Sequence, residues 1–315
     1  MWESTLKKLS DNTALKAARL WVENPINFRL INNQINCVYR FESKNKGYYL
    51  RLTHENIRSF AELEAAIRFQ QHLFNNNAPV CPTVPSKGGR CIELVEQDGL
   101  SFYSHVCGEV PGKHVDFSNQ NKELYVCWGR ALAQLHIASK SFDPENHQYL
   151  SWSNLWEDTG KLIDNESEEL QQVYEKISRF FKTFETNTDN FGLTHGDHRP
   201  GNVLYHADKV SIIDFDEPVY HWFMADIVKP FLDLCQQPYK DWEKIWHWYL
   251  EGYSGVLPID QNILASANLF SQMKSLDIYL WCKNNWFEPT APGGKPREIW
   301  LMELEQMALN PLFRY

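Results

Sequence analysis

The alternation of apolar and polar positions divides this chain into a strand-rich first part and a mainly helical remainder. In the first part, short β-branched and aromatic runs bounded by turn residues predict strands. These runs lie at 28–31, 36–41, 48–53, 91–95 and 100–106. A short helix is predicted at 13–22 and a longer one at 57–74, where apolar residues recur at three- and four-residue steps. The pattern indicates a mostly antiparallel sheet with one main helix.

The remainder of the chain combines helices with one hairpin. Apolar residues at helical spacing predict helices at 122–139, 167–186, 227–235, 241–253, about 260–283 and 297–308. Between the second and the third of these, the apolar runs 203–205 and 210–213 flank a polar turn and predict a β-hairpin. The fold class expected from the whole pattern is therefore α+β.

Polar segments stand at both outer ends of the predicted hairpin. The sequence HGDHRPGN leads into its first strand, and DFDE follows its second strand. A hairpin brings its outer ends together, so we expect Asp197 and Asn202 to lie near Asp214. Either fragment alone occurs by chance in many soluble proteins, and Asp-Gly-Asn clusters usually mark ordinary turns. The ordered set at this spacing is the more informative signal.

These residue types fit phosphoryl transfer, which needs one carboxylate near the acceptor hydroxyl and an amide and a second carboxylate on Mg²⁺. We assign Asp197 as the base and Asn202 and Asp214 as metal ligands, with Asp216 as a second acidic ligand or water anchor. Magnesium suits this set because it takes oxygen ligands and keeps waters and phosphate oxygens in its shell. Arg199 is expected to offset charge on the transferring phosphate.

The same stretch resembles the catalytic and metal-binding loops of the aminoglycoside phosphotransferase and choline kinase-like family. The family pattern, HGD-x-x-x-x-N followed by IDFD or IDFE, is matched at His195, Gly196, Asp197, Asn202, Ile213, Asp214, Phe215 and Asp216. The resemblance implies that Asp226 braces the catalytic loop and that His195 has a structural role. It also implies a two-lobed protein-kinase-like fold, with a nucleotide-binding lobe at 1–106 and a catalytic and acceptor-binding lobe at 107–315.

The resemblance also implies how the first lobe holds ATP. Arg51 on the third strand stands where kinases place the cation that binds the α and β phosphates, and Glu64 is the first choice for its acidic partner, with Glu62 as the alternative. Asn33 would lie in the turn that covers the phosphates. Family members commonly have glycine in that turn, whereas this chain has none between residues 30 and 46.

Adenine would be held by backbone groups from Ser104 to Val106, an assignment that rests on position in the family layout. His136, at the end of a predicted helix, is interpreted as a core or capping histidine. The acceptor pocket is expected in the helical region after residue 227, which is rich in tryptophan and tyrosine. Aromatic faces can hold cations or sugars, but at helical spacing they are more often core. Candidate amine or hydroxyl partners are Asp233, Asp277 and Glu288.

The composition limits which binding partners and which cellular location are expected. The formal charge of -9 argues against nucleic acid as the main partner, because phosphate backbones need a basic surface. The seven cysteines are scattered and include no C-x-x-C pair, which is typical of reduced thiols rather than a disulfide framework or zinc site. The N-terminus lacks a signal-peptide core, and no run approaches the ~20 apolar residues that span a bilayer. We expect a cytoplasmic protein without a membrane partner.

The sequence therefore predicts an ATP- and Mg²⁺-dependent phosphotransferase that acts on a hydroxyl of a small molecule. The acceptor is left open among aminoglycosides, amino alcohols, homoserine and sugar-like compounds. One alternative is a protein Ser/Thr kinase, although only nine residues separate Asp216 from Asp226, which leaves little room for an activation segment. The other alternative is a non-catalytic, pseudokinase-like nucleotide-binding module, which the glycine-free first turn favours.

Overall fold

The structure is a computed structural model of the 315-residue chain. It describes residues 9–33, 35–115, 117–118, 121–235, 242–291, 294–310 and 312–313, with only the backbone at 233–235. The chain forms two compact units. The first comprises Met1–Gly112, Phe142–Tyr149 and Ser211–Asp216, and the second comprises Lys113–Ser141, Leu150–Val210 and Glu217–Tyr315. We expected a boundary after residue 106, whereas the first unit runs on to Gly112 because the last long strand of its sheet continues to Gly108.

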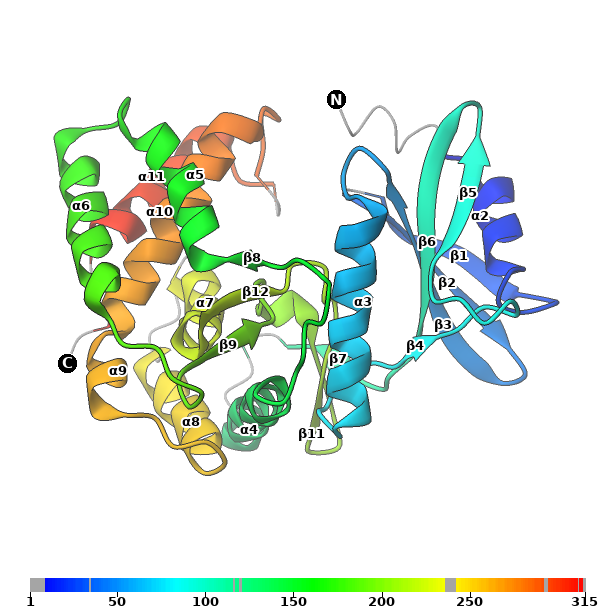
Figure 1. Ribbon diagram of the computed structural model, residues 1–315, viewed down its shortest axis with the longest axis horizontal. Coiled ribbons are helices and arrows are strands. Elements are labelled where there is room, and N and C mark those ends of the chain that lie inside the picture. The colour runs from blue at the N-terminus through cyan, green and yellow to red at the C-terminus, as the bar shows by residue number, and fades with distance from the viewer. Residues whose placement is uncertain are drawn as a thin grey trace. The chain divides into compact units, whose positions relative to one another are not determined.

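An antiparallel sheet in the order β1-β2-β3-β6-β4, with β5 also paired to β6, forms the first unit (Figure 1). Its strands are β1 (Ile26–Asn33), β2 (Cys37–Ser43), β3 (Lys46–His54), β4 (Thr83–Val84), β5 (Glu93–Gln97) and β6 (Leu100–Gly108). Alternate residues of β2, β3 and β6 point to one face, where Phe41, Leu50 and Phe102 are fully buried. The short helix α2 (Asp11–Ala18) covers this face with its alanines.

The main helix of the first unit is α3 (Phe60–Asn75). Its start is fixed by a capping box, in which Ser59 accepts from the Glu62 N–H and the Glu62 carboxylate accepts from the Ser59 N–H. Leu63 and Ile67 bury its apolar face together with Ile92. The predicted helix and the strands of this unit are thus confirmed, with ends that differ by a few residues.

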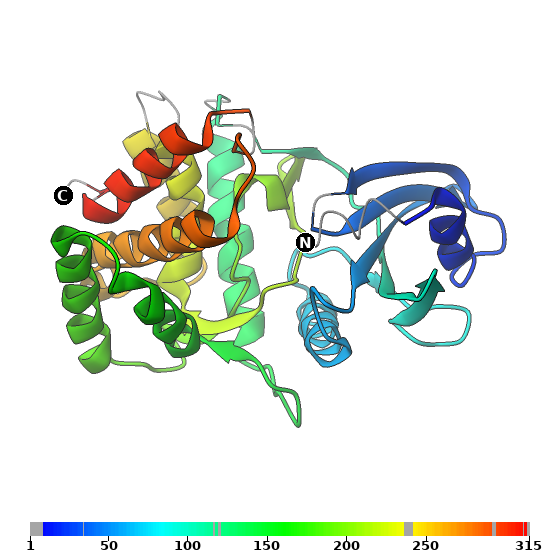
Figure 2. The same cartoon turned by 90° about the horizontal axis from the view of Figure 1, so that it is seen from above.

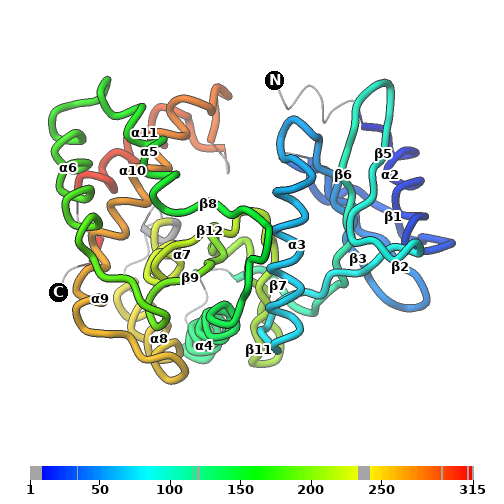
Figure 3. Tube along the Cα trace, viewed as in Figure 1, coloured from blue at the N-terminus to red at the C-terminus, as the bar shows by residue number. Residues whose placement is uncertain are grey.

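The second unit is mainly helical, and its chain path from α5 into α6 can be followed in Figure 3. Its helices are α4 (Lys122–Ser139), α5 (Trp152–Ile163), α6 (Glu168–Thr183), α7 (Phe223–Cys235), α8 (Trp242–Ser254), α9 (Gln261–Ala265), α10 (Ala267–Asn285) and α11 (Arg297–Leu309). Helices α10 and α11 pack side by side (Figure 2). Helices α4 and α8 approach closely at Gly129, which has no Cβ. A Cβ at this position would lie 1.9 Å from the Tyr249 carbonyl oxygen.

Two small sheets carry the loops of the second unit. In one, β12 (Val219–Trp222) pairs antiparallel with β9 (Phe191–Thr194) and parallel with β8 (Leu150–Ser151). In the other, the order is β11-β10-β7, from β7 (Lys113–His114), β10 (Val203–His206) and β11 (Lys209–Ile212). The predicted hairpin is therefore confirmed as β10 and β11, and the chain passes into the first unit within β11.

Several elements were not expected from the pattern. Helix α5 and the strands β9 and β12 have no predicted counterpart, and the predicted helix at 260–283 is divided into α9 and α10 at Ser266. A capping box between Ser151 and Asn154 begins α5, so a local signal for this helix does exist in the sequence. Within the part of the chain that is described, every helix is too short or too polar to cross a membrane.

Candidate active site

The catalytic loop begins with a glycine that no other residue can replace without rearrangement. Gly196 has a φ of 84°, in the left-handed region that favours glycine. A Cβ added there would lie 1.9 Å from the Glu217 carbonyl oxygen. The HGD sequence therefore needs its glycine for two reasons, backbone conformation and close approach to the segment that leads into β12.

Asp226, in the first turn of α7, braces this loop as predicted. Its Oδ2 accepts from the His195 N–H at 2.7 Å, and its Oδ1 accepts from the Gly196 N–H at 3.1 Å. His136 Nε2 lies 3.3 Å from the same Oδ2, and His136 Nδ1 lies 2.7 Å from the Tyr253 hydroxyl. Burial raises the pKa of Asp226, but the hydrogen bond and the charge of His136 lower it by a larger amount. The pKa of Asp226 therefore lies below its usual value. His136 is fully buried, which confirms its interpretation as a core histidine.

Asp197 is held from two sides within the second unit. Asn202 Nδ2 donates to the Asp197 carbonyl oxygen at 2.9 Å and to its Oδ2 at 3.2 Å. On the other carboxylate oxygen, Lys229 Nζ lies 3.2 Å from Oδ1. Lys229 stands on α7, three residues after Asp226, so one helix supplies both the brace of the loop and a cation for its acid. Sequence reasoning missed Lys229, although its spacing from Asp226 was a usable signal.

His198 was also missed. It is fully buried, and its Nε2 accepts from Trp128 Nε1 at 2.8 Å. Burial, with the neighbouring His195, lowers the pKa of His198 to about 3, so the ring is neutral at physiological pH. The indole therefore anchors the middle of the loop on α4. Arg199 follows with an exposed side chain, and its carbonyl accepts from the Asn202 N–H at 2.9 Å, which closes the short turn Pro200–Asn202.

A second group of predicted residues gathers in the first unit around Arg51. Its Nη1 lies 2.6 Å from Asp214 Oδ1, and its Nη2 lies 2.5 Å from Asp216 Oδ2. With its amide oxygen turned to the guanidinium, Asn36 accepts from Arg51 Nη2 at 2.6 Å and donates to Thr53 Oγ1 at 2.7 Å. Burial raises the pKa of Asp216, but the charges of Arg51 and Arg58 outweigh this and lower it. The structure thus brings Arg51, Asp214 and Asp216 together.

Asp214 has an unusual backbone. Its φ is 70°, a left-handed conformation that few residues other than glycine adopt, although aspartate and asparagine tolerate it best. Strained backbone that persists in a folded protein clusters at functional sites. This conformation occurs two residues after the end of β11, where the sequence predicted a metal ligand.

The structure corrects the predicted acidic partner of Arg51. Glu64 Oε2 lies 3.6 Å from His147 Nε2, and Glu62 is committed to the capping box with Ser59. In the described part of the chain, Arg51 pairs with Asp214 and Asp216 and with neither glutamate. The physical reason is the helix phase, since the cap at Ser59 places Glu62 in the first turn and leaves the Glu64 side chain half exposed.

The residues predicted to contact adenine lie inside a paired strand, and their role stays a prediction. Ser104 and Val106 lie inside β6, where Ser104 pairs with Leu52 on β3 and with Glu93 on β5. Val106 pairs with β3 and with β4 in the same way. Backbone groups of an interior strand are engaged by neighbouring strands. Asn33 ends β1 opposite Cys37, next to a turn that includes a residue outside the described part, and its phosphate role stays a prediction.

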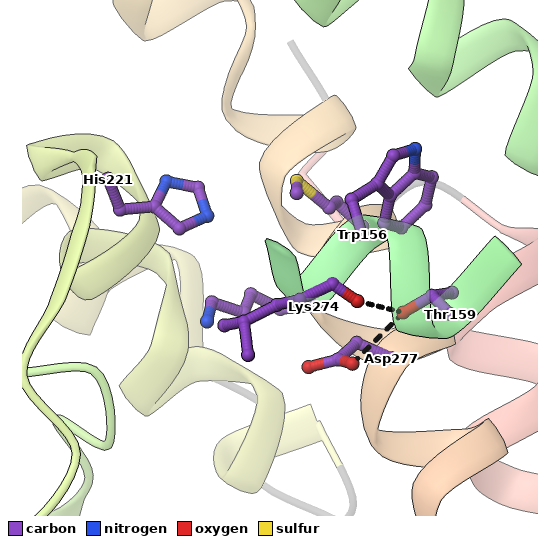
Figure 4. A pocket seen from close by; sticks show the side chains of 7 residues that line it. Trp156, Thr159, His221, Lys274 and Asp277 are labelled. Atoms are coloured by element: carbon purple, nitrogen blue, oxygen red, sulfur yellow. Dashed lines mark hydrogen bonds between the residues drawn. The ribbon is translucent and has the colours of Figure 1, made fainter. Parts of the chain in front are cut away.

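The three acidic residues predicted to bind the acceptor lie in different surroundings. Asp277 lies in a cavity of the second unit, between α5, α10 and β12, with Thr159, whose Oγ1 is 3.1 Å from Asp277 Oδ1 (Figure 4). Glu288 is exposed, and the side chain of Asp233 lies outside the described residues. Among the aromatic residues, Trp246, Tyr249, Tyr253 and Tyr279 are buried, as the core interpretation favoured. The six cysteines whose side chains are described form no disulfide bond with one another.

Each unit offers an oxygen atom of the kind that binds divalent cations. Asn202 uses its amide nitrogen on Asp197, which leaves its Oδ1 without a hydrogen bond from the described residues. Asp214 pairs with Arg51 through Oδ1, and its Oδ2 has no hydrogen-bond partner in the described part. Amide and carboxylate oxygens are the ligands that Mg²⁺ takes. Over the same residues there is no cluster of three or more histidine, cysteine or acidic side chains arranged to hold a metal.

Comparison with known proteins places these residues in context. The model of the phosphotransferase enzyme family (APH) matches residues 28–255. An amicoumacin kinase of Bacillus subtilis (strain 168) is 29% identical over 203 residues, which is 63% of this chain and 60% of that protein. A homoserine kinase of Rhizobium etli (strain CIAT 652) is 27% identical over 177 residues, or 53% of each. The match thus spans less than two thirds of these relatives' own length.

A solved structure extends the likeness to the whole fold. The amicoumacin kinase hAmiN, solved in complex with AMP-PNP, Ca²⁺ and Ami, superposes with a TM-score of 0.86 at 21% identity, and the match covers 100% of this chain and 98% of that one. The kinase-like α+β fold expected from the sequence is thereby confirmed. The family resemblance carried by the HGD and DFD segments is confirmed as well.

Proposed function

This chain belongs to the phosphotransferase enzyme family, and we propose that it transfers the γ-phosphoryl group of ATP to a hydroxyl of a small molecule with the help of Mg²⁺. The observation that carries the proposal is the setting of Asp197. Its carboxylate stands between the Asn202 amide and the Lys229 ammonium, at the end of a loop that Asp226 braces. A binding module without catalysis has no need for a carboxylate held in this way.

The roles of the residues follow from the chemistry. The acceptor oxygen attacks the γ-phosphorus, the bond to the bridging oxygen of ADP breaks, and the hydroxyl proton passes to Asp197. Lys229 keeps the Asp197 carboxylate oriented at 3.2 Å and adds positive charge near the transferring group. Asn202 and Asp214 are proposed as ligands of Mg²⁺, which would neutralise charge on the β and γ phosphates.

Arg51 is proposed to hold the nucleotide phosphates. A guanidinium presents five N–H donors in a planar fork and can bind carboxylates and a phosphate together. Two carboxylates and Asn36 fix its plane in the first unit. Arg199 is proposed as an additional cation for the transition state, because its side chain is exposed within the catalytic loop.

A small acceptor is favoured over a protein. The segment between Asp216 and Asp226 contains β12 and the start of α7, so its residues are committed to secondary structure and form no long substrate-binding loop. The named relatives are kinases of an antibiotic and of an amino acid. An acceptor with an amine or amino-acid character is therefore the first class to test.

The test is an ADP-release assay with Mg²⁺-ATP against amino acids, amino alcohols, sugars and aminoglycosides, with Asp197→Asn beside the wild type. We expect one acceptor class to stimulate the wild type and Asp197→Asn to lose at least about a thousandfold in kcat. Asp189→Asn is the matched control, because Asp189 is exposed and pairs only with Lys140 among the ion pairs of the described chain. Near-normal turnover of Asp197→Asn, or an ATP-binding protein that no acceptor stimulates, would overturn the proposal.

A further inference from the structure

Two cysteines of the first unit lie close together next to α3. Cys107 is in β6, and Cys81 precedes β4, the strand that pairs with that part of β6. Gln70 on α3 contacts both sulfur atoms, because its Nε2 donates to Cys81 Sγ at 3.0 Å and lies 3.6 Å from Cys107 Sγ. The two thiols are also hydrogen-bonded to each other. Segments that are far apart in the sequence thus contribute a pair of thiols in contact.

The surroundings of Cys107 favour its thiolate form. His105 lies two residues earlier on β6, so it points to the same face of the sheet, and it hydrogen-bonds the Cys107 sulfur. The hydrogen bond from Cys81, together with His105, holds the pKa of Cys107 well below its usual value, although burial acts in the opposite direction. The same hydrogen bond and burial raise the pKa of Cys81. Since the thiolate is the nucleophilic form of cysteine, Cys107 is the reactive member of the pair.

The two cysteines also differ in exposure. Cys107 is partly exposed, whereas Cys81 is only 4% exposed. An accessible thiolate beside a second, resolving thiol is the arrangement typical of cysteines that hydroperoxides oxidise. A zinc site is the other use of neighbouring thiols. The described residues, however, include no group of three or more histidine, cysteine or acidic side chains that could hold a metal.

We propose that Cys107 and Cys81 are a site of reversible oxidation by hydroperoxides, and that the disulfide they form weakens nucleotide binding. The inference rests on the proposed function, because it names a regulation of the same nucleotide site. It assigns different roles to the two sulfur atoms, with Cys107 as the attacking thiol and Cys81 as the resolving thiol.

The oxidation has two steps. The Cys107 sulfur attacks one oxygen of the hydroperoxide, the O–O bond breaks, and the leaving oxygen takes the thiol proton and departs as an alcohol, or as water if the oxidant is hydrogen peroxide. The Cys81 sulfur then attacks the sulfenic acid at Cys107, the S–O bond breaks, and the hydroxide leaves with the Cys81 proton as water. The two thiols lose two electrons, and the hydroperoxide gains them.

Formation of the disulfide would require a movement of Cys81. An S–S bond is about 2.05 Å long, which is much shorter than a hydrogen bond between two thiols. Cys107 is held on both sides, since β6 pairs there with Tyr49 on β3 and with Thr83 on β4. Cys81 lies outside the strands, so its segment is the one that would shift toward β6.

This movement would reach the groups proposed to act on the nucleotide phosphates. The Cys81 N–H donates to the carbonyl oxygen of Ile212 at 3.2 Å. Ile212 is the last residue of β11 and lies two residues before Asp214, whose Oδ1 is 2.6 Å from Arg51 Nη1. A shift of Cys81 would pull on this backbone pairing and displace Asp214 and Arg51. Weaker binding of the Mg²⁺-nucleotide is the expected consequence.

The test compares full-length protein before and after treatment with hydrogen peroxide. Peptide mass mapping without reduction identifies the cross-link, and calorimetry measures the binding of Mg²⁺-ADP. In the wild type we expect a cross-link between Cys81 and Cys107, an affinity for Mg²⁺-ADP about tenfold lower, and recovery of the affinity after reduction with dithiothreitol. Cys81→Ser keeps an acceptor for Gln70, should form no cross-link, and should keep its affinity within about twofold after the treatment.

The roles of the two thiols can be tested with dimedone, which labels sulfenic acids. In Cys81→Ser, dimedone should label Cys107, because the resolving thiol is absent. In Cys107→Ser, Cys81 should remain unlabelled. Cys81→Ala repeats the test if the serine variant does not fold. Labelling of Cys81 in Cys107→Ser would overturn the assignment of the attacking thiol.

Cys91→Ser is the matched control. Cys91 is a partly exposed cysteine of the same unit, but its sulfur accepts from Gln71 Nε2 at 2.9 Å instead of from Gln70. This variant should keep both the cross-link and the loss of affinity. The proposal is wrong if no cross-link forms, if Cys91 replaces one of the two cysteines in it, or if the cross-linked protein binds Mg²⁺-ADP as tightly as the reduced protein.

Failure of this inference can be told apart from failure of the proposed function, because cross-linking and Mg²⁺-ADP binding are measured without an acceptor. If an acceptor is phosphorylated and peroxide leaves nucleotide binding unchanged, the inference is wrong and the phosphotransferase stands. If the cross-link lowers nucleotide affinity while no acceptor stimulates ADP release, the inference stands and the proposed reaction is wrong. A reduced protein that does not bind Mg²⁺-ADP would overturn both.

Discussion

Charged side chains are paired in the catalytic loop, whereas the cavity between α5, α10 and β12 contains a buried charge without a partner in the described chain. In the loop, Asp226 receives two backbone N–H groups and a histidine, and Asp197 receives Asn202 and Lys229. In the cavity, Lys274 is also buried and has no partner in the described chain. The loop therefore pairs its charged groups, whereas the cavity leaves one buried ammonium without a partner among the described residues. Substitutions in the two regions should change stability with opposite signs.

The largest effect is expected at Asp226, which is 1% exposed. In Asp226→Asn, one carboxylate oxygen becomes an NH₂ group that faces N–H donors from the loop or from His136. Breaking a buried, hydrogen-bonded charge in this way costs about 3–5 kcal/mol. Urea unfolding should report a loss of this size, and kcat should fall as well. Asp158→Asn, at an exposed pair, should change stability by less than about 0.5 kcal/mol. Equal stability of the two variants would remove the contrast between the regions.

Next in size is the effect of Lys229→Met on turnover. The Lys229 side chain is 12% exposed and Asp197 is 33% exposed, so the pair is only partly shielded from water. We expect kcat to fall about a hundredfold, equivalent to about 2.7 kcal/mol, because the base loses its orientation and the site loses a positive charge. The KM for ATP should change little.

Lys229→Arg separates positioning from mere packing, because it should restore part of the lost kcat. Lys209→Met is the matched control, since Lys209 is an exposed lysine on β11. An unchanged kcat in Lys229→Met would mean that the 3.2 Å contact with Asp197 has no catalytic role.

The contrast between the regions also explains what could be predicted from the sequence. The catalytic loop is local, so its residues are adjacent in the chain and its glycine is dictated by one backbone conformation. The cavity is assembled from α5, β12 and α10, which are far apart in sequence, and no periodicity marks Lys274 or His221 as neighbours. Asp277 was identified as a candidate only because it is an acid in the expected acceptor region.

The errors in the first unit have a different origin. Glu64 was chosen by helix position without using the Ser59 cap, which fixes the phase of α3 and leaves Glu64 to pair with His147. Ser104 and Val106 were placed at the end of a strand that in fact continues to Gly108. The choice of Glu64 and the end predicted for β6 are each wrong by only a few residues, and tertiary pairing rather than local propensity sets such boundaries.

The third prediction concerns the loss of folding stability at low pH. His198 is neutral in the folded protein, with a pKa lowered to about 3, against about 6.5 in an unfolded chain. Between these values the unfolded state binds more protons, so this contribution to stability is full above about pH 6.5 and is lost as the pH falls toward 3. At pH 5 the loss from this residue should be about 2 kcal/mol.

Urea unfolding at pH 7.5 and pH 5 measures this loss. His198→Gln, which keeps an acceptor for Trp128, should depend less on pH than the wild type. His206→Asn changes an exposed histidine and should keep the wild-type dependence. If His198→Gln and wild type lose stability in parallel, burial of His198 does not set the acid sensitivity of the loop.

The smallest effect carries the opposite sign and tests the cavity directly. Lys274→Met keeps the length of the side chain and removes an ammonium that has no partner in the described chain, so the ligand-free protein should gain about 1 kcal/mol of stability. Lys161→Met, at an exposed lysine, should change stability little. A loss of stability in Lys274→Met without ligand would show that the lysine supports the fold, and the cavity would then be an ordinary part of the core.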